Sequence, residues 1–149
     1  MATAGDFWRF TLETYEKPRV SPLLIQLQDE AGRDVNILLC CLYAGLRLGL
    51  RLGPGELEAL AAAVEPWNSL VTHKLRTVRR DLKPLAADPA VAELRRAVQA
   101  TELEAERLAQ TRLEAALPAG PIEPAGAALA RTNLTAYAGA AGAKLVDLL

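Results

Sequence analysis

The stretch that decides the fold is DVNILLCCLYAGL, residues 34–46. From Ile37 onward its side chains are apolar on every side of a helix, and such a helix has to be surrounded by the rest of its own protein. Asp34 stands where an N-cap residue belongs, since its carboxylate can accept from the first free backbone N–H groups of a helix. Gly53-Pro54-Gly55 cannot continue a helix. We therefore predict a buried central helix that begins at Asp34 and ends before Gly53.

The rest of the chain carries helical patterns. Ala, Leu, Glu and Arg recur at helical spacing, and runs of Val, Ile and Thr with period two are missing. Two further stretches space their apolar residues by alternating fours and threes, and the second follows an Asp88-Pro89 helix start. The sequence thus predicts an all-α protein, an irregular bundle of about six helices that contains a long antiparallel helical hairpin, residues 67–85 with 88–117. The expected hairpin seams are Val71, Leu75, Val78, Leu82 and Leu85 on the first helix and Val91, Leu94, Val98, Ala105 and Leu108 on the second.

Proline residues divide the chain near its C-terminal end. Residues 118–124, PAGPIEP, are predicted to form a Pro-rich linker because they cannot continue a helix. Residues 1–117 before it are expected to form a helical domain. Residues 125–149 after it are rich in Ala and Gly, and we expect a C-terminal helix packed on the same domain, since small residues let backbones approach closely.

Composition argues against several classes of protein. The net charge of −1 is atypical of a protein that binds nucleic acid by neutralising phosphates. The longest apolar run, Ile37–Leu46, is far shorter than the about 20 residues of a membrane span. Residues 1–10 lack the basic-then-apolar order of a signal peptide, so a cytoplasmic location is expected. Cys40 and Cys41 are adjacent, a spacing that would strain a disulfide between them, and both are predicted to be reduced core residues.

Catalytic and cofactor-binding patterns are also missing. His73 is the only histidine, which disfavours zinc sites and the Glu-x-x-His pairs of di-iron bundles, so no metal or other cofactor is expected. The chain has no Gly-rich phosphate loop and no Gly-x-Ser-x-Gly turn. A noncatalytic protein is therefore favoured over an enzyme.

A candidate polar pocket lies around the start of the central helix. Asp34 and Asn36 are polar side chains beside an apolar helix, and with Tyr43 and either Trp67 or Tyr137 they could line a site for a small molecule. The structural interpretation, which we favour, is that Asp34 caps the helix and Asn36 completes the same hydrogen-bond network.

A candidate interaction or anion site is the basic helix face formed by Arg76, Arg79, Arg80 and Lys83. Such a face could bind phosphate, an acidic protein or RNA. The second limb of the predicted hairpin, however, carries acidic residues at matching spacing, and an internal ion network with Glu102, Glu104 and Glu106 would explain both stripes. The sequence leaves both interpretations open.

Several of these segments occur together in a recognisable order. They are Phe7-Trp8 with Tyr15, Leu27-Gln28-Asp29 followed by Gly32, Asp34-Val35-Asn36-Ile37-Leu38-Leu39, and Arg76 with Arg79-Arg80. In this order the chain resembles, over residues 6 to about 110, a proteobacterial family of conserved hypothetical proteins classed as a domain of unknown function. The resemblance implies a small bacterial, cytoplasmic helical protein without an established activity, and it supplies no catalytic residues.

The sequence as a whole favours a noncatalytic interaction or regulatory protein that uses the basic helix face. The alternative is a small-molecule-binding protein or unrecognised enzyme with the pocket near Asp34, Asn36 and Tyr43. We expect an unidentified protein partner rather than nucleic acid, and self-association into a homo-oligomer is compatible with the sequence.

Overall fold

The computed structural model describes residues 5–119 and 122–149, and within them the protein is all-α, as predicted. Its α-helices are α1 (Asp6–Tyr15), α2 (Val20–Ala31), α3 (Val35–Tyr43), α4 (Pro54–Trp67), α5 (His73–Leu82), α6 (Pro89–Ala116) and α7 (Ala127–Ala143). Single π-helical turns extend α3 and join α4 to α5, at Ala44–Leu48 and Asn68–Thr72. Short 3₁₀ turns follow α5 and α7, at Lys83–Leu85 and Lys144–Leu148.

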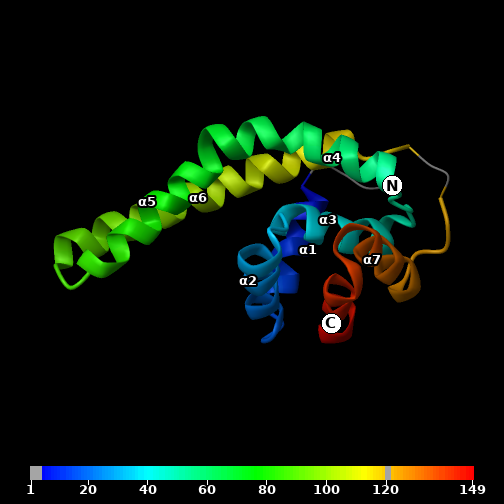
Figure 1. The fold of residues 1–149 in the computed structure, drawn as a ribbon, viewed down its shortest axis with the longest axis horizontal. Coiled ribbons are helices and arrows are strands. Elements are labelled where there is room, and N and C mark those ends of the chain that lie inside the picture. Colours follow the sequence, from blue (N-terminus) through cyan, green and yellow to red (C-terminus); the bar gives the residue numbers. More distant parts are fainter. Residues whose placement is uncertain (1–4, 120–121) are drawn as a thin grey trace.

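Helix α3 forms the centre of the body, as its apolar sequence predicted. Every residue from Asn36 to Tyr43 is buried. Helices α1, α2, α6 and α7 pack around it (Figure 1). The helix begins at Asp34, whose carboxylate accepts from the backbone N–H of Ile37, so the predicted N-cap is confirmed. Gly32 ends the preceding helix with a positive φ of 65°, a conformation that glycine adopts without steric cost.

A long helical hairpin crosses this body and extends beyond it. Its first limb runs through α4, the π-helical turn Asn68–Thr72 and α5, and Pro66 does not interrupt it. Its second limb is α6, which begins at the predicted cap Asp88. Figure 1 shows α5 and the first half of α6 projecting side by side away from the body. Between His73 and Thr101, a segment that the structure describes in full, no residue is buried. We call residues 73–101 the hairpin arm.

The inner face of α6 differs from the predicted seam. Of the five seam residues proposed for this helix, Ala105 is buried, but Leu94 and Leu108 are exposed. The buried residues of α6 are Glu102, Ala105, Ala109, Gln110 and Leu113. The seam prediction was wrong at Leu94 and Leu108 because two polar side chains occupy inner positions and find hydrogen-bond partners there.

Helix α7 packs against α3 and the π-helical turn that follows it. It reaches this position after the proline-rich segment, of which residues 120 and 121 lie outside the described residues. After these two residues, Glu123 makes a two-point contact with Arg51, with both N–O distances at 2.7 Å. The backbone of α7 changes direction at Gly139, where φ is 67°.

Candidate functional site

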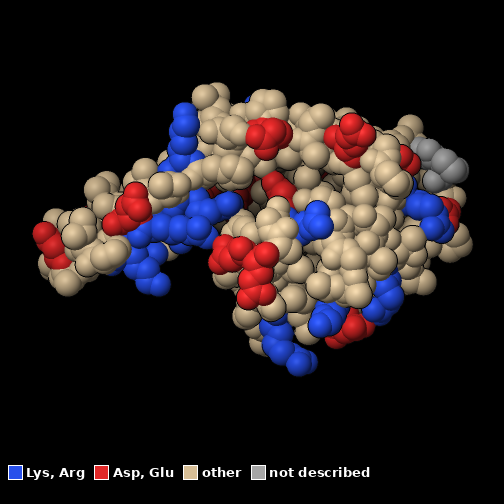
Figure 2. All heavy atoms as spheres, in the orientation of Figure 1, with Lys and Arg blue, Asp and Glu red and all other residues tan. Residues whose placement is uncertain are grey.

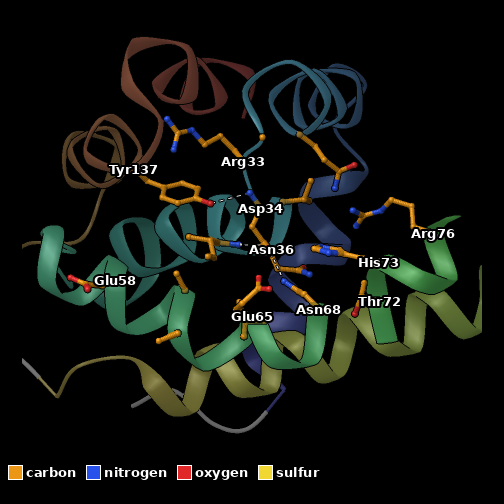
Figure 3. Close-up of a pocket in the computed structure, with 17 residues that line it drawn as sticks. Arg33, Asp34, Asn36, Glu58, Glu65, Asn68, Thr72, His73, Arg76 and Tyr137 are labelled. Carbon is orange, nitrogen blue, oxygen red and sulfur yellow. Dashed lines mark hydrogen bonds between the residues drawn. The ribbon is translucent and has the colours of Figure 1, made fainter. Parts of the chain in front are cut away.

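A cavity lies between the base of the hairpin and the body, with a volume of about 640 Å³. One wall is formed by α4, the following π-helical turn and the start of α5, and the other by the end of α2 and the start of α3. Tyr137 of α7 closes one side (Figure 3). This volume falls in the range typical of pockets that hold small organic molecules, about 300–1,000 Å³.

Asp34 ties three elements together at this cavity. Its Oδ1 accepts from the backbone N–H of Ile37 at 3.0 Å, and its Oδ2 accepts from the Asn68 amide at 2.6 Å. Its own backbone N–H donates to the hydroxyl of Tyr137 at 2.9 Å. Both carboxylate oxygens are thus engaged in structural hydrogen bonds, which supports the helix-start interpretation of this residue.

Asn36 belongs to a second buried network behind the cavity. Its Oδ1 accepts from the Gln110 side-chain amide at 3.0 Å. Gln110 and the hydroxyl of Thr11 in turn bond to each other, at 2.9 and 3.1 Å. Buried polar groups are stable when they find partners in this way, and the network joins α1, α3 and α6. Asn36 therefore borders the cavity but points its oxygen into the core.

Tyr43, the third residue of the predicted polar pocket, lies elsewhere. Its ring stacks on Phe7 with a centroid distance of 5.1 Å, and it borders a different, more open hollow together with Phe10 and Arg47. Trp67 donates its indole N–H to the carbonyl of Ala105 within the hairpin. The structure thus brings Asp34 and Asn36 together with Tyr137, and not with Tyr43.

Two members of the predicted basic face turn toward α6. Arg79 makes a two-point contact with Glu102, from Nε to Oε2 at 2.5 Å and from Nη2 to Oε1 at 3.3 Å. Arg76 lies 3.7 Å from Glu102 through Nε and 3.8 Å from Glu106 through Nη2. The internal ion network therefore contains Arg76 and Arg79 with Glu102 and Glu106, whereas Glu104 is exposed and forms none of these ion pairs.

The other two members of the face are open to solvent. The Arg80 side chain is 54% exposed and reaches Asp29 of α2 at 3.2 Å. Lys83 is exposed in the turn at the end of α5. Exposed ion pairs of this kind contribute little to stability, about 0–1 kcal/mol. Arg80 and Lys83 are therefore the solvent-exposed part of the predicted basic face.

Charge is distributed unevenly between the hairpin arm and the rest of the chain. The arm carries seven Lys and Arg residues against three Asp and Glu residues, whereas the remainder carries ten against fifteen. Figure 2 shows the basic side chains gathered on the side of the arm that faces the body, opposite a group of acidic side chains there. The near-zero net charge of the whole chain conceals this separation.

Glu106 is the most perturbed carboxyl of the ion network. Burial and the neighbouring Glu102 together raise its pKa from 4.5 to about 7, and Arg76 opposes the shift. Its side chain is 21% exposed. Near neutral pH, protonated and ionised forms of Glu106 therefore coexist in the folded protein.

The pH dependence of stability should report on Glu106. Since its folded pKa of about 7 exceeds the ordinary value of 4.5, the folded state binds more protons than the unfolded state between these values, and stability falls as pH rises through this window. We expect a loss on the order of 2 kcal/mol from this group, measured by urea unfolding across the window. Glu106→Gln should flatten the slope and Glu104→Gln should not, and equal slopes for both variants and the wild type would contradict the assignment.

The cysteines are not available as nucleophiles. Cys40 and Cys41 are free and buried. Burial raises the pKa of the Cys40 thiol well above its usual value and that of Cys41 to about 12, so neither forms a thiolate at neutral pH. The described residues also contain no group of three or more His, Cys, Asp or Glu side chains placed to hold a metal ion.

Four buried polar residues were missed by the sequence predictions. They are Asn68, Thr72, Gln110 and Asn133, all buried. Asn68, Gln110 and Asn133 bond to groups in distant parts of the chain, whereas the Thr72 hydroxyl has no partner among the described residues. Pro66 gave the only nearby signal, because proline removes one helical hydrogen bond and the π-helical turn with Asn68 and Thr72 follows it.

Comparison with known families and proteins gives a single result. A family model described as "Protein of unknown function (DUF2390)" matches residues 6–113. The match starts at the first residue of α1, includes the whole hairpin arm and ends at the buried Leu113 of α6. Comparisons with curated proteins and with solved structures gave no match. None of the helices in residues 5–119 and 122–149 combines the length and apolarity that crossing a membrane requires.

Proposed function

The chain belongs to the family described as "Protein of unknown function (DUF2390)", and we propose that it is a noncatalytic interaction or regulatory protein whose hairpin arm binds an acidic partner protein. The observation that carries this proposal is the absence of any buried residue between His73 and Thr101, a fully described segment. A folded hairpin that contributes so little to its own core is explained by a contact outside the chain. We also propose a cytoplasmic location, which two free cysteines support.

The arm offers a partner both apolar and basic contacts. Val78, Leu85 and Leu94 are each about half exposed, at 45%, 59% and 54%. Contiguous exposed apolar patches with a polar rim are typical of interaction sites, and these three side chains lie on the two limbs of the arm and the turn between them. The arm's excess of basic residues adds attraction for an acidic surface and favours rapid association.

The base of the arm is held in place by charged contacts. Arg79 pairs with Glu102, and the Nε of Arg95 donates to the Arg79 carbonyl at 3.1 Å. At the body, Arg80 reaches Asp29. An arm that is already ordered loses little conformational entropy when it binds, which supports a preformed binding element.

Charge reversal at the exposed end of the basic face tests this proposal. We expect the double variant Arg80→Glu/Lys83→Glu to lose at least tenfold in capture of partner proteins from an extract of the source cells, because two attractive charges become repulsive toward an acidic surface. Captured proteins are compared by mass spectrometry. A protein that the wild type captures and the variant does not is thereby identified, and its sequence shows whether it is acidic.

A matched control uses exposed cations of the body. Lys17→Glu/Arg19→Glu changes the net charge by the same amount, away from the arm, and should capture the same proteins as the wild type. Circular dichroism establishes that both variants fold. If Arg80→Glu/Lys83→Glu is folded and captures the same proteins as the wild type, the arm is not the interaction surface.

A further inference from the structure

The cavity at the base of the arm contains a partly buried cation whose hydrogen-bonding capacity is incompletely used. Arg76 has five N–H donors, and its side chain is only 17% exposed. The carboxylates of Glu102 and Glu106 lie 3.7 and 3.8 Å away, beyond hydrogen-bond distance. Gln28 accepts from Nη1 and Nη2 at 3.2 Å when its amide oxygen faces them. Among the described residues, no other acceptor lies within hydrogen-bond distance of this guanidinium.

The acidic neighbours of Arg76 make no hydrogen bond with its guanidinium. Glu102 is engaged by Arg79 through the shorter, two-point contact. Glu106 is the carboxyl left for Arg76, and burial together with the nearby Glu102 raises its pKa to about 7. Arg76 is therefore the less closely paired of the two arginines that face Glu102.

Thr72 is a second polar group at this end of the cavity without a hydrogen bond. It borders the cavity and is only 1% exposed, and its hydroxyl has no partner in the described part of the chain. Every other described threonine has one: six donate to the carbonyl one helical turn earlier, and Thr11 donates to Gln110. Thr72 is the last residue of the π-helical turn Asn68–Thr72, where the regular α-helical bonding pattern is interrupted.

The cavity continues away from Arg76 along an apolar wall. Val35, Ile37, Ala61, Ala62 and Val64 line it. Figure 3 shows Arg76 at one end and Glu58 at the other, with Asp34 between them. From Ala61 to Arg76 the helical rise amounts to about 22 Å, at about 1.5 Å per residue. The site is therefore elongated, with the cation of Arg76 at one end, the carboxylate of Glu58 at the other, and an apolar wall between them.

We propose that this cavity binds an organic carboxylate with an apolar chain, whose carboxylate is held by the guanidinium of Arg76 and whose chain lies along Val64 and Ala61. A carboxylate matches the planar fork of a guanidinium and can accept two parallel hydrogen bonds from it. The chain buries apolar surface against the wall, which supplies most of the affinity. This site is separate from Arg80 and Lys83, the exposed end of the basic face. A negative result for ligand binding in the cavity therefore leaves the proposed partner binding by the arm untouched, and the reverse also holds.

Titration with octanoate and with 1-octanol, followed by two-dimensional NMR of the ¹⁵N-labelled protein, tests the cationic end. We expect saturable octanoate binding with shifts at Val35, Val64 and Thr72, and at least tenfold weaker binding of the neutral alcohol. Arg76→Gln should weaken octanoate binding at least tenfold and leave 1-octanol unchanged. Arg107→Gln, an exposed arginine of α6 away from the cavity, should change neither. Equal affinities for octanoate and 1-octanol, no saturation by octanoate, or an unchanged affinity in Arg76→Gln would overturn the proposal.

A second pair of variants tests the apolar end without altering any charge. Ala61→Trp places a large side chain in the far end of the cavity, whereas Ala59→Trp lies on the same helix outside it. Dodecanoate, which has the longer chain, should bind at least fivefold more weakly to Ala61→Trp than to the wild type, and octanoate should lose less. Ala59→Trp should bind both as the wild type does. Equal dodecanoate affinity in the two tryptophan variants would contradict the placement of the chain.

Discussion

Gly45→Ala is expected to destabilise the protein by about 3 kcal/mol, because overpacking of this kind cannot be relieved by a side-chain movement. A Cβ at Gly45 would lie 2.3 Å from the Cα and 2.4 Å from the backbone N of Ala130 in α7. The Gly45 carbonyl also accepts from the backbone N–H of Gly126 at 2.9 Å. Helix α7 would have to separate from the central helix, and urea unfolding measures the free energy lost.

Gly55→Ala is the matched control for this substitution. Gly55 lies in the first turn of α4, and a Cβ there would have no atom within 4 Å. Replacing a helical glycine with alanine stabilises by roughly 0.5–1 kcal/mol where space allows. Similar unfolding free energies for Gly45→Ala and Gly55→Ala would show that α7 does not pack closely against Gly45.

Asn133→Leu is expected to cost about 3 kcal/mol or more, because each buried polar group left without a partner costs about 1–3 kcal/mol. Asn133 is fully buried and forms hydrogen bonds with three backbone groups of the body. Its amide donates to the carbonyls of Leu50 at 2.9 Å and Cys41 at 3.3 Å, and its Oδ1 accepts from the N–H of Leu52 at 2.8 Å. Leucine has a similar size but satisfies none of these groups.

The neighbouring Thr132 provides the control for Asn133. Thr132 is exposed, and its hydroxyl bonds only to the Ala128 carbonyl of its own helix. Thr132→Ala should therefore change the unfolding free energy by less than about 0.5 kcal/mol. If Asn133→Leu behaved like Thr132→Ala in urea unfolding, the hydrogen bonds of Asn133 would not hold the body together. Both large effects concern α7, which lies outside residues 6–113 that match the family model.

The centre of the fold was predictable because its signals are local. A run of apolar residues and a capping aspartate within one segment determine where α3 begins and that it is buried. The second role of Asp34, as the acceptor for Asn68, was not predictable, because the two residues are 34 positions apart. That contact depends on how the hairpin lies across the body, which no short sequence pattern specifies.

The buried face of α6 in the hairpin was not predictable from the spacing of its apolar residues. Heptad spacing predicted that Leu94 and Leu108 face the first limb, yet both are about half exposed, at 54% and 45%. Glu102 and Gln110 are buried in that helix because distant partners compensate for their desolvation. A pattern of apolar and polar residues predicts that such polar side chains face solvent. The face of α6 that packs against the first limb was therefore predicted incorrectly.

For the basic face, the sequence left pairing and exposure as alternatives, and the structure contains both. Arg76 and Arg79 turn toward the acidic residues of α6, whereas Arg80 and Lys83 do not. One position along a helix rotates a side chain by about 100°, so neighbouring arginines can have different surroundings. Only the packing of α5 on α6 decides which of them are paired.

We propose that the hairpin arm binds a partner and contributes little to the stability of the fold. Replacing Arg80–Leu94 with a short Gly-Asn-Gly loop tests it most directly, since Arg79 and Arg95 are in contact across the two limbs and a short loop can join them. The shortened protein should unfold cooperatively with a Tm within a few degrees of the wild type and should no longer capture its partner from cell extract. A shortened protein that fails to fold, or one that captures the same partner as the wild type, would contradict the claim.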